Sequence, residues 1–220
     1  MTPRCDPSSP NTRKALLEAA LFCFAERGFE GTSLRMVADR ADKHMSLIAH
    51  HFGNKDGLYL AVFRDMLENL VADRPMPPGA PAPPRDADEA AARLRWIIRN
   101  RLREMHFVFE HGDPKRAAYF RLWLSAVRMP LPELEPLLRE GVAPLKMQIA
   151  DCIRTLRPDF PDRDIPFWCA LIHGQFLTNT MFRRFNELVF GPESYPPTVD
   201  ELADHIADIT LRAIGRPEPA

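Results

Sequence analysis

Apolar residues recur at helical spacing along most of the chain, and prolines separate the stretches that show this pattern. Proline is excluded from helix interiors because it lacks the amide hydrogen and clashes with the preceding turn. The intervals between prolines therefore predict helices. In the first interval, one helix face is apolar at i, i+3, i+4 and i+7 spacing: Leu17, Ala20, Leu21 and Phe24.

Nine helices are predicted in this way, and no alternation typical of strands competes with them. They cover residues 11–28, 34–41, 45–52, 55–73, 86–110, 115–129, 136–156, 166–186 or 188, and 198–214. Gly28 ends the first helix, and two capping boxes, Asp86 to Glu89 and Thr198 to Glu201, begin the fifth and the last. The expected fold class is all-α.

The placement of the 22 prolines indicates how the chain is divided. Residues 11–74 contain none, whereas six fall between residues 75 and 84. A run so rich in proline is typical of an extended linker. We therefore expect two helical domains, residues 11–73 and 86–216, joined by a linker over residues 74–85.

Composition narrows the functional classes. The 220 residues include 29 Lys and Arg and 30 Asp and Glu, a net charge of −1, so a surface that binds nucleic acid would have to be small and local. The longest apolar stretch, residues 165–177, is too short for a membrane span, and the N-terminus lacks the apolar core of a signal peptide. The four cysteines lack metal-type spacing. With no catalytic motif, we expect a cytoplasmic protein that is not an enzyme, with no cofactor, no metal and no membrane partner.

Residues 32–52 predict two short helices that meet across the turn at 42–44. This is the geometry of a helix-turn-helix, whose second helix enters the major groove of DNA while the first crosses the backbone. An ordinary helical hairpin in an all-α core has the same spacing. Spacing alone leaves both interpretations open.

A wider set of residues resembles the TetR family of transcriptional regulators over about residues 11–70. The resemblance rests on Ala20, Phe24, Gly28, Phe29, Thr32, Ser33, Val37, Ala38, Ala41, the segment 46–53, Lys55, Asp56, Gly57 and Leu58. It implies an N-terminal three-helix DNA-binding domain and a helical C-terminal domain for effector binding and dimerisation. Glu133, Glu135, Pro136 and the segment 173–175 resemble the CecR or YbiH subgroup of that family.

The turn and the second helix depart from the family pattern. The chain has Ala41-Asp42-Lys43-His44 where the family usually has Ala-Gly-Val-Ser, and it has Ala49 where an aromatic residue or arginine is usual. Aspartate is among the residues that best tolerate positive φ after glycine, so we expect the turn to form.

Charge supports a local DNA-binding edge, because residues 32–55 carry a net charge of +2 besides their histidines. Thr32, Ser33 and Lys55 lie at predicted helix starts, which favour phosphate. Met45 and Ser46, together with His44 and Ala49, would read bases. The candidate DNA-binding residues are Thr32, Ser33, Arg35, Lys43, His44, Met45, Ser46, Ala49, His50 and Lys55.

Polar residues interrupt the apolar faces of the C-terminal helices. Polar groups buried without partners cost free energy, so their convergence on a cavity would indicate a ligand site. The candidate pocket residues are Arg99, His106, Phe109, Arg121, Trp123, His173, Gln175 and Asn179. In the alternative interpretation, the aromatic residues are plain core and the polar ones pair with one another or face solvent or a second subunit.

The last two predicted helices, residues 165–186 and 198–214, are strongly apolar. The family resemblance implies that they form a four-helix dimer interface. Such a dimer would place its two DNA-binding domains on successive major grooves of a palindromic operator. We expect a homodimeric repressor that responds to an unidentified small-molecule effector. A helical DNA-binding or interaction protein without an effector is the alternative.

Overall fold

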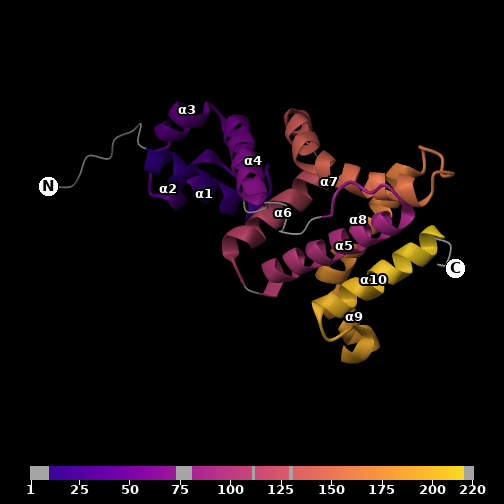
Figure 1. Ribbon diagram of the computed structural model, residues 1–220. Coiled ribbons are helices and arrows are strands. Elements are labelled where there is room, and N and C mark those ends of the chain that lie inside the picture. Colours follow the sequence, from indigo (N-terminus) through magenta and orange to yellow (C-terminus); the bar gives the residue numbers. More distant parts are fainter. Residues whose placement is uncertain (1–9, 73–80, 111, 129–130, 216–220) are drawn as a thin grey trace. The chain divides into compact units, whose positions relative to one another are not determined.

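Helices make up nearly all of the regular structure in the computed structural model, which describes residues 10–72, 81–110, 112–128 and 131–215 (Figure 1). These residues form ten α-helices and two short 3₁₀ turns, and no strand occurs among them. The helices are α1 (Pro10–Arg27), α2 (Leu34–Ala41), α3 (Ser46–Phe52), α4 (Lys55–Ala72), α5 (Ala87–Glu110), α6 (Pro114–Arg128), α7 (Glu135–Leu156), α8 (Ile165–Met181), α9 (Arg183–Phe190) and α10 (Val199–Ile214). The 3₁₀ turns are η1 (Pro132–Leu134) and η2 (Pro192–Ser194). The all-α prediction is confirmed.

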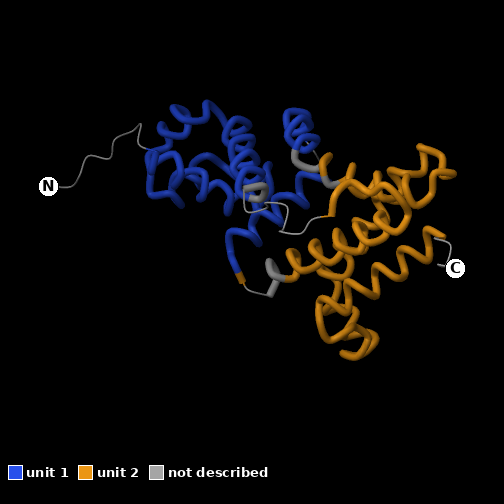
Figure 2. The backbone as a smooth tube through the Cα atoms, viewed as in Figure 1, with its two compact units in different colours: residues 1–74, 113–141 blue, residues 75–112, 142–220 orange. Residues whose placement is uncertain are grey.

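The chain folds as two compact units (Figure 2). Unit 1 comprises residues 1–74 and 113–141, and unit 2 comprises residues 75–112 and 142–220. Helix α6 therefore packs with the N-terminal helices, although the sequence placed it in the second domain. Its apolar face does not reveal which core it joins. Most of the expected linker, residues 73–80, lies outside the described residues.

The core of unit 1 is built around α1, which packs against α2, α4 and α6. Since α1 has neighbours on several sides, it buries more than one face. The four residues of its predicted stripe are at most 5% exposed, and Leu16 and Cys23 beside them are also buried. The ring of Tyr59 on α4 packs edge-on against Phe24, with ring centroids 4.8 Å apart.

The core of unit 2 joins α5, α7, α8 and α10. Helices α5 and α10 lie side by side, and three arginines spaced four residues apart on α5 pair with three aspartates of the same spacing on α10. The pairs are Arg95 with Asp208, Arg99 with Asp204, and Arg103 with Asp200. Each pair is about half exposed, so the pairs align the helices more than they stabilise them.

One predicted helix is divided in two. The sequence indicates a continuous helix from residue 166 to 186 or 188, but α8 ends at Met181 and α9 begins at Arg183. Asn179 and Thr180 donate side-chain hydrogen bonds to the carbonyls of Gln175 and Phe176 in their own helix, at 2.8 and 2.7 Å. Such bonds compete with the helical backbone and favour a bend.

Among the described residues, no helix combines the length and apolarity needed to cross a membrane.

Candidate nucleic-acid interface

Local capping sets the ends of α2. The Ser33 hydroxyl accepts a hydrogen bond from the Met36 amide at 3.2 Å and begins the helix. At the other end Asp42 adopts φ 51° and ψ 51°, and it is the only non-glycine residue with positive φ in the described part of the chain. The amides of Asp42 and Lys43 bond back to Asp39 and Ala38, which is a Schellman ending. The turn forms with aspartate in the left-handed position.

Asp42→Gly is expected to raise the free energy of unfolding by about 0.5–1 kcal/mol, because glycine adopts positive φ without steric cost and because a negative charge leaves the helix C-terminus. Thermal or urea unfolding measures the change. Asp39→Gly is the matched control: it lies inside the same helix, where glycine costs about 0.5–1 kcal/mol relative to alanine. Destabilisation by both substitutions would contradict strain at Asp42.

Helix α3 is attached to unit 1 through one side. Ile48 is its only fully buried side chain and is 0% exposed. Ser46, Ala49 and His50 are exposed, as is Met45 at 53%, immediately before the helix. A short helix that buries one residue and presents this outer face can enter a groove. The structure thus brings the predicted reading residues to one exposed surface.

His44 and Ser46 contact one another at the start of α3. Both are exposed, and the Ser46 hydroxyl oxygen lies 2.8 Å from His44 Nδ1. The Ser46 backbone amide also donates to Nδ1, at 3.4 Å. The His44 ring therefore accepts a hydrogen bond from the amide of Ser46, the first residue of α3, whereas Met45 at the N-cap makes no side-chain capping bond.

Lys55 is positioned by the turn that follows α1. Its ammonium lies 4.4 Å from the centroid of the Phe29 ring and donates to the Glu30 carbonyl at 3.4 Å. One hydrogen bond leaves other N–H donors of the ammonium available, and the side chain is half-buried. The lysine is therefore held at the N-terminus of α4 with donors still free for an anion.

Thr32 is the one candidate that the structure places inside the protein. Its side chain is 2% exposed, and its hydroxyl lies 3.0 and 2.8 Å from the carbonyl oxygens of Cys23 and Gly28. The hydroxyl thus satisfies carbonyls at the end of α1, and we correct its assignment from DNA contact to structural support. The sequence pattern could not separate the two roles, because threonine serves both at a helix start.

The remaining basic residues of this edge differ in how firmly other residues hold their side chains. Arg35 is exposed, with its Nε atom 3.9 Å from an Asp39 carboxylate oxygen, and Lys43 is half-buried and donates to the Asp42 carbonyl at 3.2 Å. Arg40 donates to both carboxylate oxygens of Glu26, at 2.9 and 3.0 Å. Arg40 is consequently fastened to α1, whereas Arg35 remains accessible.

His50 and His51 do not form a metal site with their surroundings. Their rings pack edge-to-face with centroids 5.0 Å apart. Among the residues that the structure describes, no group of three or more His, Cys, Asp or Glu side chains is arranged to hold a metal ion. His50 is exposed, and His51 is half-buried.

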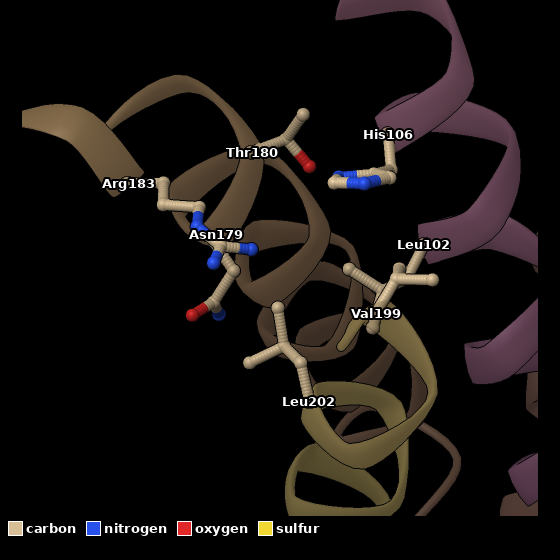
Figure 3. A pocket seen from close by; sticks show the side chains of 7 residues that line it. All are labelled: Leu102, His106, Asn179, Thr180, Arg183, Val199 and Leu202. Atoms are coloured by element: carbon tan, nitrogen blue, oxygen red, sulfur yellow. The ribbon is translucent and has the colours of Figure 1, made fainter. Parts of the chain in front are cut away.

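Unit 2 contains a small cavity of about 60 Å³ between α5, α8 and α10. In Figure 3, His106 and Thr180 point toward one another at one end, while Leu102, Val199 and Leu202 supply apolar side chains. Asn179 and Arg183 complete the lining. Arg183 also pairs with Glu187 at 2.9 Å. The cavity is polar at one side and apolar at the other.

A larger groove of about 450 Å³ shares two lining residues, Asn179 and Leu202, with this cavity. Its lining combines polar and apolar side chains from α8, α9, α10 and the loop containing η2: Gln175, Asn186, Phe190, Ser194, Tyr195, Pro196, His205, Ile206 and Ile209. The Asn186 amide donates to the Tyr195 hydroxyl at 2.7 Å and ties the loop to α9.

The structure brings together three of the eight candidate pocket residues, His106, Gln175 and Asn179, at these two hollows. Two others make local bonds: Arg99 pairs with Asp204, and His173 Nδ1 lies 3.2 Å from the Cys169 carbonyl oxygen. Burial lowers the pKa of His173 and favours the neutral ring.

The other three candidates are not gathered at the hollows. Arg121 is exposed and Trp123 half-buried on α6, which belongs to unit 1, and the side chain of Phe109 lies outside the described residues. Sequence reasoning missed Thr180, Arg183, Asn186, Tyr195 and His205. The polar run Thr178-Asn179-Thr180 inside an apolar helix was the available signal.

Comparison with known proteins agrees with this geometry. Residues 16–62 match the family described as bacterial regulatory proteins, tetR family. The HTH-type transcriptional repressor AcnR of Corynebacterium glutamicum is 44% identical over 55 residues, which are 25% of this chain and 29% of AcnR. The HTH-type transcriptional regulator BetI of Burkholderia thailandensis is 36% identical over 86 residues, 39% of this chain and 42% of BetI. The chain thus spans less than half of the length of these curated relatives.

Solved structures resemble the chain over most of its length. A TetR transcriptional regulator from Agrobacterium tumefaciens has a TM-score of 0.58 at 18% identity, and the match covers 93% of this chain and 94% of that one. HlyIIR, a hemolysin II transcriptional regulator, has a TM-score of 0.55 at 16% identity, with 90% and 96% covered. These likenesses show a shared fold. The CecR or YbiH subgroup stays a prediction. The similarity to the tetR family of bacterial regulatory proteins thus lies in the N-terminal region, over residues 16–62.

Proposed function

We propose that the protein is a cytoplasmic transcriptional regulator that binds a palindromic operator as a homodimer. The observation that carries the proposal is the outer face of α3, where Met45, Ser46, Ala49 and His50 are exposed while Ile48 anchors the helix. Ser33, Arg35, Lys43 and Lys55 flank this face and would bind phosphates. The named relatives AcnR and BetI are a repressor and a regulator, which favours control of transcription as the outcome of binding.

Selection from a randomised double-stranded DNA library tests the proposal directly. The full-length protein should enrich an inverted repeat whose half-sites are about 10 bp apart, centre to centre, because a two-fold dimer reaches successive major grooves. Genome-wide capture of bound DNA would then identify the regulated genes. Enrichment of no sequence in the selection would contradict the proposal.

Lys55→Ala is expected to weaken binding to all DNA sequences alike and to lower the slope of log K against log[salt] by about 1. The reason is that one ammonium–phosphate contact releases about one counterion and carries no sequence information. Binding titrations at several salt concentrations measure the slope.

Lys115→Ala is the matched control. The Lys115 ammonium lies 5.4 Å from the Tyr119 ring centroid, so both substitutions remove a lysine placed over an aromatic ring of unit 1. The control should leave the salt slope unchanged. An equal salt slope for Lys55→Ala and the wild type would show that Lys55 does not contact a DNA phosphate.

We also propose that a small molecule binds unit 2 and alters operator affinity. The cavity and the groove support this, since Asn179 and other polar side chains border apolar surface in both. A ligand shifts the equilibrium only by its difference in affinity between the DNA-bound and free states. A compound should therefore lower operator affinity in the wild type and lose that effect in Asn179→Leu.

The alternative is a DNA-binding protein without an effector. It is favoured by the local bonds of several polar side chains in unit 2: Asn179 donates to its own helix, and Thr210 donates to Gln175 Oε1 at 3.2 Å. A metabolite screen in which thermal unfolding and operator affinity both stay constant would support it.

The dimer interface proposed is the face of α8 and α10. Phe167, Leu171 and Gln175 follow one another at four-residue spacing on α8, and Gln175 contacts Thr210 of α10, next to Ile209. Phe167, Leu171 and Ile209 are exposed. Large apolar side chains that gather on one face mark an interaction surface.

A further inference from the structure

We propose that His44 reads the N7 acceptor of a purine in the operator through its Nε2–H group, and that Ser46 holds the ring in the tautomer needed to do so. This inference rests on the proposed function, and it assigns a specific chemistry to one residue of the reading face. Its basis is the contact between the two side chains at the start of α3.

The tautomer follows from the donors around Nδ1. The Ser46 backbone amide points at Nδ1 from 3.4 Å, and an amide N–H can only donate. Nδ1 of the neutral ring is therefore an acceptor, which leaves the hydrogen on Nε2. The Ser46 hydroxyl, 2.8 Å from the same nitrogen, then donates to it as well. Two donors from one residue fix both the tautomer and the ring orientation.

The place of His44 in the helix-turn-helix brings its Nε2–H group within reach of base edges. His44 is exposed, and it directly precedes Met45 and α3, the second helix of the helix-turn-helix. The first residues of such a helix contact base edges in the major groove. A single N–H donor needs an acceptor there: both purines present N7, guanine also presents O6 and thymine presents O4, whereas cytosine presents only its amino donor. The donor therefore excludes cytosine, and we assign it to N7, the acceptor that both purines share.

His44→Ser provides the test, because serine removes the Nε2–H donor while its hydroxyl keeps a hydrogen-bond acceptor near the Ser46 amide. The wild type and the variant are each used to select sites from the same randomised double-stranded library. We expect the wild type to require a purine at one position of each half-site, and the variant to accept any base there while keeping the rest of the motif.

A second measurement identifies the atom. The selected site is synthesised with a 7-deazapurine at that position, which removes N7 and leaves base pairing intact. Wild-type affinity should fall about three- to tenfold, the change expected for one neutral hydrogen bond, and His44→Ser should bind both DNAs equally. A 7-deazapurine outside the half-sites controls for altered DNA shape and should change neither affinity.

Ser46→Ala tests the positioning role. It should reduce the effect of the 7-deaza substitution, whereas Ser125→Ala, an exposed serine on α6, should not. If the wild type enriches a motif and His44→Ser enriches the identical motif, or if the affected position is a pyrimidine, the inference is wrong and the proposed function stands. If the wild type enriches no motif, the proposed function and this inference both fail.

Discussion

Replacing Ile48 with alanine is expected to lower the free energy of unfolding of unit 1 by about 2–5 kcal/mol and to abolish high-affinity operator binding. Ile48 is 0% exposed and is the only buried residue of the seven in α3. Without it, the helix loses its one fully buried side chain and keeps only the partly buried Leu47 and Phe52 against the core. If α3 is no longer held against the core, its outer residues cannot be positioned against DNA bases.

Hydrogen exchange over residues 46–52, together with urea unfolding, measures this effect. Met45→Ala is the comparison, because Met45 is 53% exposed and its loss should leave stability within about 0.5 kcal/mol of the wild type. Met45→Ala should change only DNA binding. Unchanged exchange in Ile48→Ala would show that α3 has another anchor.

If the chain dimerises as proposed, the double substitution Leu171→Glu and Ile209→Glu should yield a monomer and reduce operator affinity by about 10²–10⁴-fold. Both side chains are 44% exposed on the proposed interface. Two carboxylates buried against a second copy would lack partners, which an interface does not tolerate. A monomer contacts only one half-site, so it loses the gain in operator affinity that comes from linking two DNA-binding domains.

Light scattering or sedimentation at micromolar concentration gives the mass, and DNA titration gives the affinity. Val127→Glu is the control, since Val127 is 53% exposed on α6 and lies outside the proposed interface. Far-UV circular dichroism should be unchanged in both proteins. A double variant that keeps a dimeric mass, or a wild type that is monomeric, would contradict the interface.

The helices could be predicted largely from the order of residues. Capping residues, proline and glycine act on the backbone of their own neighbourhood, so the bounds of α2 were predicted residue for residue, and those of α4 and α10 to within one residue. The cap at Ser33 and the capping box at Thr198 are likewise made within one turn. The break at Phe182 was not predicted, because the apolar pattern continues through it and only the side-chain bonds of Asn179 and Thr180 reveal it.

The exposed face of α3, which we propose binds DNA, was predictable for the same local reason. A helix of seven residues has one side to bury, and Ile48 identifies that side, so Ser46, Ala49 and His50 had to face outward. The error was Thr32, whose hydroxyl bonds to carbonyls of α1. The residues that line the two hollows of unit 2 were predicted less well. A pocket is lined by residues from distant segments, and spacing within one helix does not indicate which of those residues meet.

The sequence alone predicted the helical class and the two short helices on either side of the turn at 42–44, since each depends on residues a few positions apart. Tertiary packing determined which residues far apart in the chain come into contact. Helix α6 joins the core of α1, and Lys55 lies over Phe29. Three arginines of α5, Arg95, Arg99 and Arg103, face the aspartates of α10. Apolar burial is non-directional, so an amphipathic helix specifies that it must be covered but not by which partner. The partner is selected by how the whole set of helices packs without voids.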